Sequence, residues 1–489
     1  MAAGEKELTP GFRYQQLALE LEEKIRGGQY RVGERLPSLR ELHNRTALSI
    51  TTIAHAYMEL EARGMVESRE RSGYYVRPLI RNLLPLPLTE LQPVARPRKV
   101  PINPLAESIL SAIRDRDVLP FGEALPANTL LPSRQLARSA RAVTATYFEG
   151  GGLHYDPANG VAALKRQIAA RSIGFCRGID AEEIIVTNGC MDAIRLCLRA
   201  VAQPGDIVII ESPTFSCYLQ LIGKMGLLAL EIPTSPRTGI DLGLLEEALF
   251  NGVWRRNRVA ACLLNPSFHN PLGFHMADES KRELVEMLAV HGVPLIEDDS
   301  CGELSIGDSR PAPLKSFDTR GLVLYCSSFS KTVAPDFRVG WVVPGRFREE
   351  ILRLKFNSSI AQAKLPQLIL ADFFENRQYE RHLRRLRVAI KGQLGSTSHA
   401  IARYFPEGTK MTAPEGGYMI WLELAADVDG VKLFHLAREE GIFIVPGVVF
   451  SSTGRFNNCI RISCGTPWSE RMEKGMERLG VLVDRLQSA

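Results

Sequence analysis

The chain has 489 residues, of which 45% are hydrophobic and 24% charged, a profile typical of soluble globular proteins that predicts about three domains. No stretch approaches the ~18 consecutive apolar residues that a membrane span needs, and the opening MAAGEKELTPG lacks the apolar core of a secretory signal. The nine cysteines form no C-x-x-C pair, which favours a cytoplasmic location over a disulfide scaffold or a zinc site.

The net charge of +5 is unevenly distributed along the chain. The first 100 residues hold 16 lysines and arginines against 12 glutamates and no aspartate, so most of the excess positive charge lies there. This distribution is a mild indication that the N-terminal region has a polyanionic partner.

The N-terminal region predicts three helices followed by a β-hairpin. Apolar residues at helical spacing indicate the first helix, namely Tyr14, Leu17, Leu21 and Ile25. Ser38 and Glu41 match a capping box at the start of a second helix, and Ser49 can cap a third, with Ile53, Tyr57 and Leu60 as its buried stripe. Two short strands are expected at 65–69 and 73–77. This order predicts a winged helix-turn-helix.

The segment GERLPSLREL, the S-x-T-T that opens the third helix and the hairpin ending in SGYYV together resemble the GntR-type head of bacterial regulators. The resemblance covers residues 12–77 and implies a DNA-binding domain whose third helix lies in the major groove. Ile50 departs from it, because the family usually has an arginine there. An alternative is a helical dimerisation head that binds no nucleic acid. The DNA-binding residues that the resemblance implies are Arg35, Ser38 and Arg40 before and at the second helix, Ser49, Thr51, Thr52 and His55 at the third, and Arg69 and Arg71 at the hairpin.

Residues 78–104 contain seven prolines, a density that favours an extended, semi-rigid linker. The remaining residues, 105–489, are expected to form one large α/β domain, with a large part at about 150–355. The smaller part is expected at about 356–489, together with the segment that follows the linker.

Short apolar runs alternate with helical patterns after the linker. Five of these runs are apolar throughout, which is typical of parallel strands buried on both faces, and they lie at 183–187, 206–212, 259–265, 293–299 and 322–328. The fold class is therefore α/β with a mostly parallel sheet. Ligands of such sheets bind beyond the carboxyl ends of the strands, and polar motifs follow several of the predicted strands.

Those motifs follow a particular order along the chain. A glycine turn at Asn188-Gly189 opens a helix, Phe215 follows a strand, and Asn270 stands in an Asn-Pro-x-Gly turn. Asp298 ends a strand, and SSFSK with an arginine seven residues later completes the series. Each motif alone is common, but the order resembles the fold-type-I pyridoxal-phosphate enzymes, the aminotransferases, over residues 118–485.

The resemblance implies pyridoxal 5'-phosphate as cofactor, with Lys331 forming the Schiff base and Asp298 keeping the pyridine nitrogen protonated. It further implies that Arg461, in CIRISCG, holds the α-carboxylate of an amino acid. Tyr155 matches a position that reaches the phosphate across a dimer interface in family members. The other implied cofactor-binding residues are Gly189, Cys190 and Met191 with Ser328, Ser330 and Arg338 at the phosphate, and Phe215, Asn270 and Cys301 at the ring.

A GntR-type head, a proline-rich linker and an aminotransferase-like body together resemble the MocR subfamily of bacterial transcription regulators. We therefore expect a cytoplasmic homodimer that binds operator DNA and senses an amine or amino acid by external aldimine formation at Lys331. Ser300 and Cys301 replace the usual ring-bonding tyrosine and Leu272 replaces a threonine, which weighs against efficient transamination. An active aminotransferase with a regulatory head remains the alternative, favoured by Arg461, and a cofactor-free scaffold is a third possibility.

Overall fold

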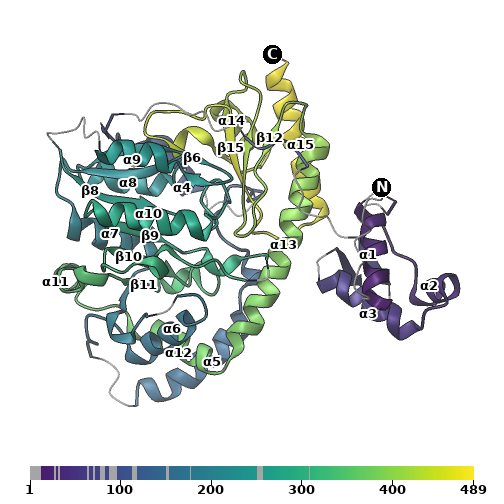
Figure 1. Ribbon diagram of the computed structural model, residues 1–489, viewed down its shortest axis with the longest axis horizontal. Coiled ribbons are helices and arrows are strands. Elements are labelled where there is room, and N and C mark those ends of the chain that lie inside the picture. The colour runs from purple at the N-terminus through teal and green to yellow at the C-terminus, as the bar shows by residue number, and fades with distance from the viewer. Residues whose placement is uncertain are drawn as a thin grey trace, which may run out of the picture. The chain divides into compact units, whose positions relative to one another are not determined.

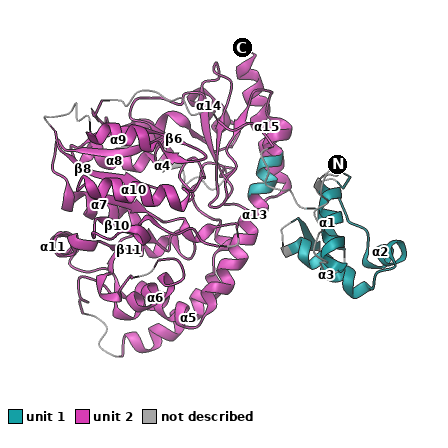
Figure 2. Cartoon of the chain, in the orientation of Figure 1, with its two compact units in different colours: residues 1–81, 394–399 teal, residues 82–393, 400–489 magenta. Residues whose placement is uncertain are grey.

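The computed structural model describes most of the chain as two compact units (Figure 2). One unit comprises residues 1–81 with 394–399, and the other comprises residues 82–393 with 400–489. The described residues are 13–26, 29–30, 34–62, 65–69, 72–76, 83–87, 96–112, 118–149, 154–176, 178–250, 257–307 and 309–488.

The N-terminal unit is a winged helix-turn-helix, as predicted. Its elements are α1 (Arg13–Arg26), α2 (Leu39–Thr46), α3 (Ile50–Ala62) and the antiparallel strands β1 (Val66–Arg69) and β2 (Gly73–Val76). Ile53, Tyr57 and Leu60 of α3 are fully buried in one apolar cluster with Leu17 and Leu21 of α1. The spacing of these residues at three and four positions is what places them on one helix face.

Serine side chains begin both short helices. Ser38 Oγ accepts a hydrogen bond from the backbone N of Glu41 at 3.2 Å, and Ser49 Oγ accepts one from Thr52 N at 3.1 Å. The other half of the predicted capping box is wrong. The Glu41 carboxylate accepts from Arg45 Nη2 at 2.7 Å instead of returning to Ser38, because the i,i+4 arginine offers it a charged donor on the same helix face.

A nine-stranded sheet forms the centre of the C-terminal unit (Figure 1). Its strands are β3 (Arg98–Lys99), β4 (Ile185–Thr187), β5 (Ile207–Ser212), β6 (Leu228–Ser235), β7 (Gly239–Ile240), β8 (Val259–Leu264), β9 (Leu295–Asp298), β10 (Val323–Ser328) and β11 (Gly340–Val343). The order is β3-β6-β5-β8-β9-β10-β11-β4, with β7 paired to β6. The pairs between β6 and β10 are parallel, whereas β11 runs antiparallel to both its neighbours. The sheet is thus mostly parallel, as predicted.

Helices cover both faces of this sheet. They are α4 (Pro104–Ala112), α5 (Ser133–Tyr147), α6 (Ala162–Ser172), α7 (Cys190–Val201), α8 (Ser216–Lys224), α9 (Leu242–Phe250), α10 (Asp278–Val290), α11 (Arg348–Ser359) and α12 (Lys364–Glu375). Along β10, Leu324 and Cys326 belong to the apolar cluster that includes α7, while Tyr325 between them belongs to the cluster that includes α6 and α12. Alternate residues therefore enter two different cores, which explains why the strand is apolar throughout.

A smaller antiparallel sheet completes this unit. Its order is β12 (Lys410–Met411), β13 (Met419–Glu423), β15 (Cys459–Ser463), β14 (Val445–Pro446), and its helices are α13 (Gln378–Tyr404), α14 (Gly430–Glu439) and α15 (Glu470–Gln487). The segment after the linker joins it through a bridge between Leu119 and Ile442.

Parts of the proline-rich linker are built into the same unit. Residues 98–99 form the edge strand β3, and Pro104 begins α4, where a missing N–H costs nothing. The Pro85 carbonyl accepts a hydrogen bond from Met411 N at 2.8 Å, and Pro87 is buried. At these residues the linker is thus attached to the body.

Candidate functional site

Lys331 lies just beyond the carboxyl end of β10, where the sequence predicts a covalent anchor. Its Nζ donates to the Ala124 carbonyl at 2.7 Å. Burial lowers the pKa of this amine, while the nearby Cys301 and Asp298 act to raise it. Lowering the pKa increases the fraction of neutral amine, which is the form that attacks an aldehyde.

Asp298 ends the neighbouring strand β9 and is 5% exposed. Its carboxylate accepts hydrogen bonds from the phenol of Tyr218, from Ser300 N at 2.9 Å and from Cys190 Sγ at 3.4 Å. The carboxylate is therefore fixed by donors from α7, α8 and its own turn. A buried, fixed carboxylate is what the protonated nitrogen of a pyridine ring requires as a partner.

An anion cradle forms where α7 begins beside the turn after β10. Gly189 caps α7 at φ +82° and ψ 173°, a conformation that is almost exclusive to glycine, and a Cβ there would collide with the Arg338 guanidinium. Arg338 donates to the carbonyl of Asn188 at 3.1 Å and to Ser330 Oγ at 3.3 Å. The first-turn amides of α7, at Cys190 and Met191, add donors that a helix cannot satisfy itself.

Arg461 of β15 is held against the N-terminal segment of the body. Its Nη1 donates to Asn270 Oδ1 at 3.0 Å and its Nη2 to the Gly122 carbonyl at 2.6 Å. Its Nε has no hydrogen-bond partner among the described residues, although the side chain is only 4% exposed. Burial lowers its pKa to about 10. A buried guanidinium with an unpartnered donor suits a carboxylate ligand.

The remaining predicted residues of the body lie around or outside this centre. Phe215 caps α8, is half-buried and meets Tyr218 edge-to-face, with ring centroids 5.3 Å apart. Cys301 is buried, and burial raises the pKa of its thiol to about 11 against the lowering effect of Lys331. Ser328 is buried at the end of β10, whereas Tyr155 is 79% exposed in this single chain.

Three polar residues of this region were not predicted. Tyr218 bonds Asp298, and Asn265 joins two predicted residues by donating to the Asp298 carbonyl at 2.8 Å and accepting from Asn270 N at 2.8 Å. Tyr418 is fully buried and donates to the Ala124 carbonyl at 3.1 Å. The Asn-Pro pair at Asn265, which follows an apolar strand as Asn270 does, was the one signal in the sequence for any of them.

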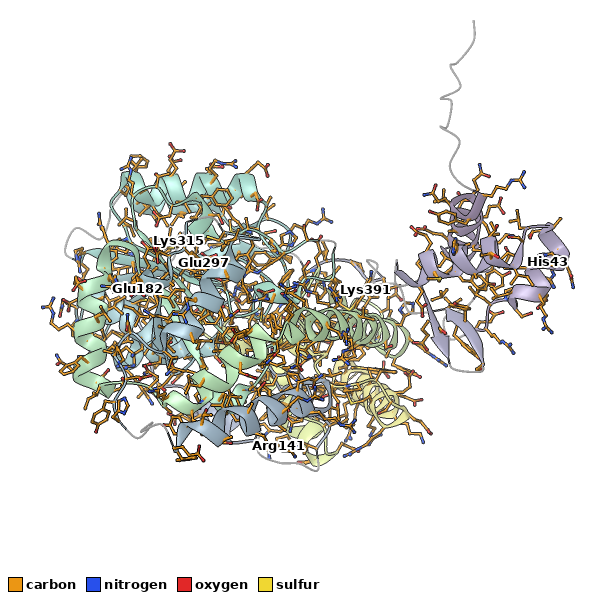
Figure 3. The ribbon with its side chains drawn as sticks, turned by 90° about the horizontal axis from the view of Figure 1, so that it is seen from below. His43, Arg141, Glu182, Glu297, Lys315 and Lys391 are labelled. Carbon is orange, nitrogen blue, oxygen red and sulfur yellow. The ribbon has the colours of Figure 1, made fainter. Side chains whose placement is uncertain are left out.

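A buried ionic cluster supports the chain on either side of Asp298. The carboxylate of Glu297 accepts from the backbone amides of Leu314 and Lys315 at 2.7 and 3.0 Å, and burial raises its pKa to about 8 (Figure 3). Asp299 pairs with Arg310, whose guanidinium lies 3.5 Å from the centroid of the Phe175 ring. These contacts fix the turn that carries Asp298 and Cys301.

The residues present fit pyridoxal phosphate. A buried amine of lowered pKa, a fixed carboxylate and a glycine-lined anion cradle lie at the carboxyl ends of β9, β10 and β4 within one unit. When bound, this cofactor supplies an aldehyde that condenses with primary amines and a ring that accepts electrons from the bound amine.

The predicted DNA-binding residues lie along α2, α3 and the wing. Arg35, Arg40, Thr51 and His55 are exposed, as is Ile50 at 45%, while Thr52 is half-exposed. The caps Ser38 and Ser49 are also exposed. Arg69 ends β1, and Arg71 lies outside the described residues.

The turn between α2 and α3 is fixed by His43, whose Nδ1 lies 2.6 Å from the Leu48 carbonyl oxygen (Figure 3). Beside the wing, the Arg35 guanidinium lies against Gly73, where a Cβ would come within 3.1 Å of Nε. A side chain larger than hydrogen at Gly73 would therefore press on Arg35, which the resemblance places at a phosphate.

Comparisons with known proteins match both units. Residues 13–76 match the family of bacterial regulatory proteins of the gntR type, and residues 127–479 match aminotransferase class I and II. The chain is similar to two HTH-type transcriptional regulators of Escherichia coli, YdcR at 38% identity over 96% of this chain and 99% of the relative, and YjiR at 36% over 97% and 99%.

Solved structures resemble the body. The α-aminoadipate aminotransferase LysN of Thermus thermophilus, complexed with N-(5'-phosphopyridoxyl)-L-leucine, superposes with a TM-score of 0.72 at 27% identity, over 80% of this chain and 96% of that one. The kynurenine aminotransferase of Pyrococcus horikoshii, in complex with PMP, gives 0.73 at 25% identity over the same shares.

Fold and site thus define a protein that joins a GntR-type DNA-binding head to an aminotransferase-type body. Because its relatives share this arrangement over nearly their whole length, the chain belongs to the MocR subfamily of GntR-type transcription regulators. None of the helices among the described residues is long and apolar enough to cross a membrane.

Proposed function

We propose that this regulator holds pyridoxal phosphate at Lys331 and senses an amine or amino acid there. The effector competes with Lys331 for the cofactor's aldehyde and shifts a conformational equilibrium that alters operator binding. A ligand shifts such an equilibrium only by the difference in its affinity for the two states. The proposal therefore requires that DNA affinity change whenever the effector is bound.

One observation carries this proposal. Lys331, Asp298 and Arg461 come from motifs up to 163 positions apart in the chain, yet the charges of Asp298 and Arg461 both act on the buried Lys331 amine. Each is fixed by other residues: Lys331 by the Ala124 carbonyl, Asp298 by Tyr218, and Arg461 by Asn270 and Gly122. Residues of these types, fixed in this way, suit binding of an amine that also carries a carboxylate.

The individual roles are part of the proposal. Lys331 is the covalent anchor, Asp298 the partner of the ring nitrogen and Arg461 the partner of the effector's carboxylate. The residues assigned to the phosphate are Gly189, Cys190, Met191, Ser328, Ser330, Arg338 and Tyr155, and those assigned to the ring are Phe215, Asn270 and Cys301.

We also propose how the chain is organised and where it acts. Residues 12–77 bind operator DNA, residues 78–104 link them to the body, and residues 105–489 bind the cofactor. An operator with two half-sites needs two heads, so the working form is a homodimer acting on DNA in the cytoplasm. The exposed Tyr155 side chain is free to reach a second copy, which supports this arrangement.

A second candidate is an active aminotransferase with a regulatory head. The buried Arg461 with its open Nε favours it, because a carboxylate clamp serves turnover as well as sensing. The thiol of Cys301 disfavours it, because a thiol whose pKa is about 11 replaces the more acidic phenol that usually bonds the ring oxygen.

An absorption titration of the cofactor-loaded protein against a panel of amino acids and amines tests the proposal, with operator binding followed on the same samples. We expect one chemical class to change the cofactor spectrum once, without turnover, and to change operator affinity at the same concentrations. Steady conversion of a keto-acid acceptor would instead support the aminotransferase. A spectral change with no effect on DNA binding would contradict sensing.

A further inference from the structure

A cavity of about 310 Å³ lies between the large sheet and the small sheet, and Lys331 is not among the residues that line it. Its walls come from the ends of β5 and β6, the turn after Asn270, the strand β13 and the loop before β15. The volume lies at the lower end of the range for small-molecule sites.

The inner wall of this cavity is apolar. Trp421 and Leu272 line it and are only 2% and 3% exposed, so the cavity reaches into the interior of the unit. Phe456 adds a second aromatic ring, T-shaped to Trp421 with centroids 5.8 Å apart. Such walls suit a ligand with an aromatic or aliphatic body.

The charge in the cavity is positive. Arg455 lines it, lies 5.4 Å from the Phe456 ring centroid, and makes no hydrogen bond or ion pair with any residue that the structure describes. The one acidic residue in the wall, Glu423, is neutralised by Lys410 at 2.6 Å. A free guanidinium beside apolar surface favours a carboxylate attached to an apolar body.

The cavity touches both the linker and the residues that fix Arg461. Pro87 of the linker lines it, and two residues earlier Pro85 is bonded to Met411 of β12. Leu272 lies two residues after Asn270, which bonds Arg461, and Trp421 is the cross-strand partner of Arg461. An occupant would therefore contact the linker at Pro87 and also Leu272 and Trp421, which lie next to the residues around Arg461.

We propose that this cavity is a second small-molecule site, which takes a small carboxylic acid with an apolar or aromatic body and strengthens the attachment of linker residues 83–87. The site goes beyond the proposed function, because its ligand carries no amine and cannot react with an aldehyde.

Calorimetric titration of the full-length, cofactor-loaded protein tests the site, with phenylacetate, benzoate and hexanoate as probes. At least one of the three should bind. The neutral amide of that probe should bind the wild type at least about tenfold more weakly than the acid does. The Arg455→Gln variant should bind the acid at least about tenfold more weakly than the wild type, because each change removes a charge-assisted hydrogen bond. Arg461→Gln should leave its affinity unchanged, which separates this cavity from the effector site.

Two results would overturn the site: no binding of any probe with a Kd below about 10 mM, or a loss in Arg461→Gln that Arg455→Gln does not show.

Hydrogen exchange at the Met411 amide, which bonds Pro85, tests the linker contact. A probe concentration that just saturates the wild type should slow this exchange in the wild type and slow it clearly less in Arg455→Gln. Equal exchange with and without probe would overturn the strengthened attachment of the linker, and neither readout depends on whether Lys331 senses an amine.

Discussion

Lys331 and Tyr418 donate to the same backbone oxygen. Lys331 Nζ lies 2.7 Å and Tyr418 Oη 3.1 Å from the carbonyl of Ala124, although Tyr418 directly precedes β13 of the small sheet and Lys331 follows β10 of the large one. Ala124 lies in the segment that also bonds Arg461 through Gly122. The segment 122–124 thus contacts both the proposed anchor, Lys331, and the proposed carboxylate partner, Arg461. The Tyr418 phenol shares the Ala124 carbonyl with the Lys331 amine.

Tyr418→Phe should raise the pKa of Lys331. With the phenol gone, the Ala124 carbonyl is left to the amine alone, and the protonated amine gains more from it than the neutral one. A hydrogen bond of about 1 kcal/mol corresponds to a shift of somewhat under about one pH unit. Because neutral amine is the nucleophile, cofactor capture by the apoprotein rises with pH through this pKa, so the variant's profile should move to higher pH.

Stopped-flow absorbance at a series of pH values measures this profile. Tyr404→Phe is the matched control, because Tyr404 bonds Glu473 at 2.8 Å on the surface of the same unit. A Tyr418→Phe profile that overlays the wild type, or moves to lower pH, would show that the shared carbonyl does not set the acidity of Lys331.

Arg338→Gln should weaken the apparent affinity for pyridoxal phosphate about tenfold to a hundredfold, the range expected for losing hydrogen bonds to a charged group. Gly189→Ala should weaken it similarly, because the added methyl collides with the Arg338 guanidinium and the backbone there suits only glycine. Equilibrium cofactor titration measures both. Arg348→Gln, which removes an arginine paired with Glu349 elsewhere in the unit, should leave the affinity unchanged.

Arg461→Gln should separate two kinds of effector. Amino acids should lose at least about tenfold in affinity, because their carboxylate loses a charged partner, whereas primary amines without a carboxylate should bind as before. Absorption titration of the cofactor-loaded variant measures both. Arg438→Gln, an exposed arginine of α14, is the control. Equal losses for amines and amino acids would mean that Arg461 only supports the fold.

The head should bind DNA with a steep dependence on salt, each neutralised phosphate adding about −0.9 to the log–log slope. Arg40→Ala should weaken binding to all sequences alike and make the slope shallower by about one, while Thr51→Ala should change which sequence is preferred. Fluorescence anisotropy on operator and scrambled duplexes at several salt concentrations measures both effects. A uniform loss from Thr51→Ala would place the recognition surface elsewhere than α3.

The parts of the fold that could be predicted are those whose pattern is local. The strand β10 reads as a continuous apolar run because its alternate residues enter two cores. The edge strand β3 could not be predicted, because two residues between prolines carry no periodicity and their pairing with β6 is decided by a strand about 130 positions away. The capping-box motif likewise gives no sign that the Glu41 carboxylate bonds Arg45 instead of returning to the Ser38 backbone.

The candidate site likewise combines residues that a local motif reveals with residues that only the packing of distant elements brings in. Lys331, Asp298 and Arg338 stand in motifs at strand ends, and the order of these motifs resembles the aminotransferases, so the resemblance could assign a chemistry to each. Tyr218 bonds a carboxylate 80 positions away, and Tyr418 a carbonyl 294 positions away. Such contacts are created by the packing of whole elements, and a single tyrosine in the sequence gives no sign of them.

Borohydride reduction of the cofactor-loaded protein, followed by peptide mass spectrometry, decides whether Lys331 holds the cofactor. Reduction converts the imine to a stable amine and fixes the cofactor to the residue that holds it. We expect a phosphopyridoxyl adduct on the peptide containing Lys331 and none in Lys331→Ala. An adduct on another lysine, or none in the wild type, would exclude Lys331 as the anchor.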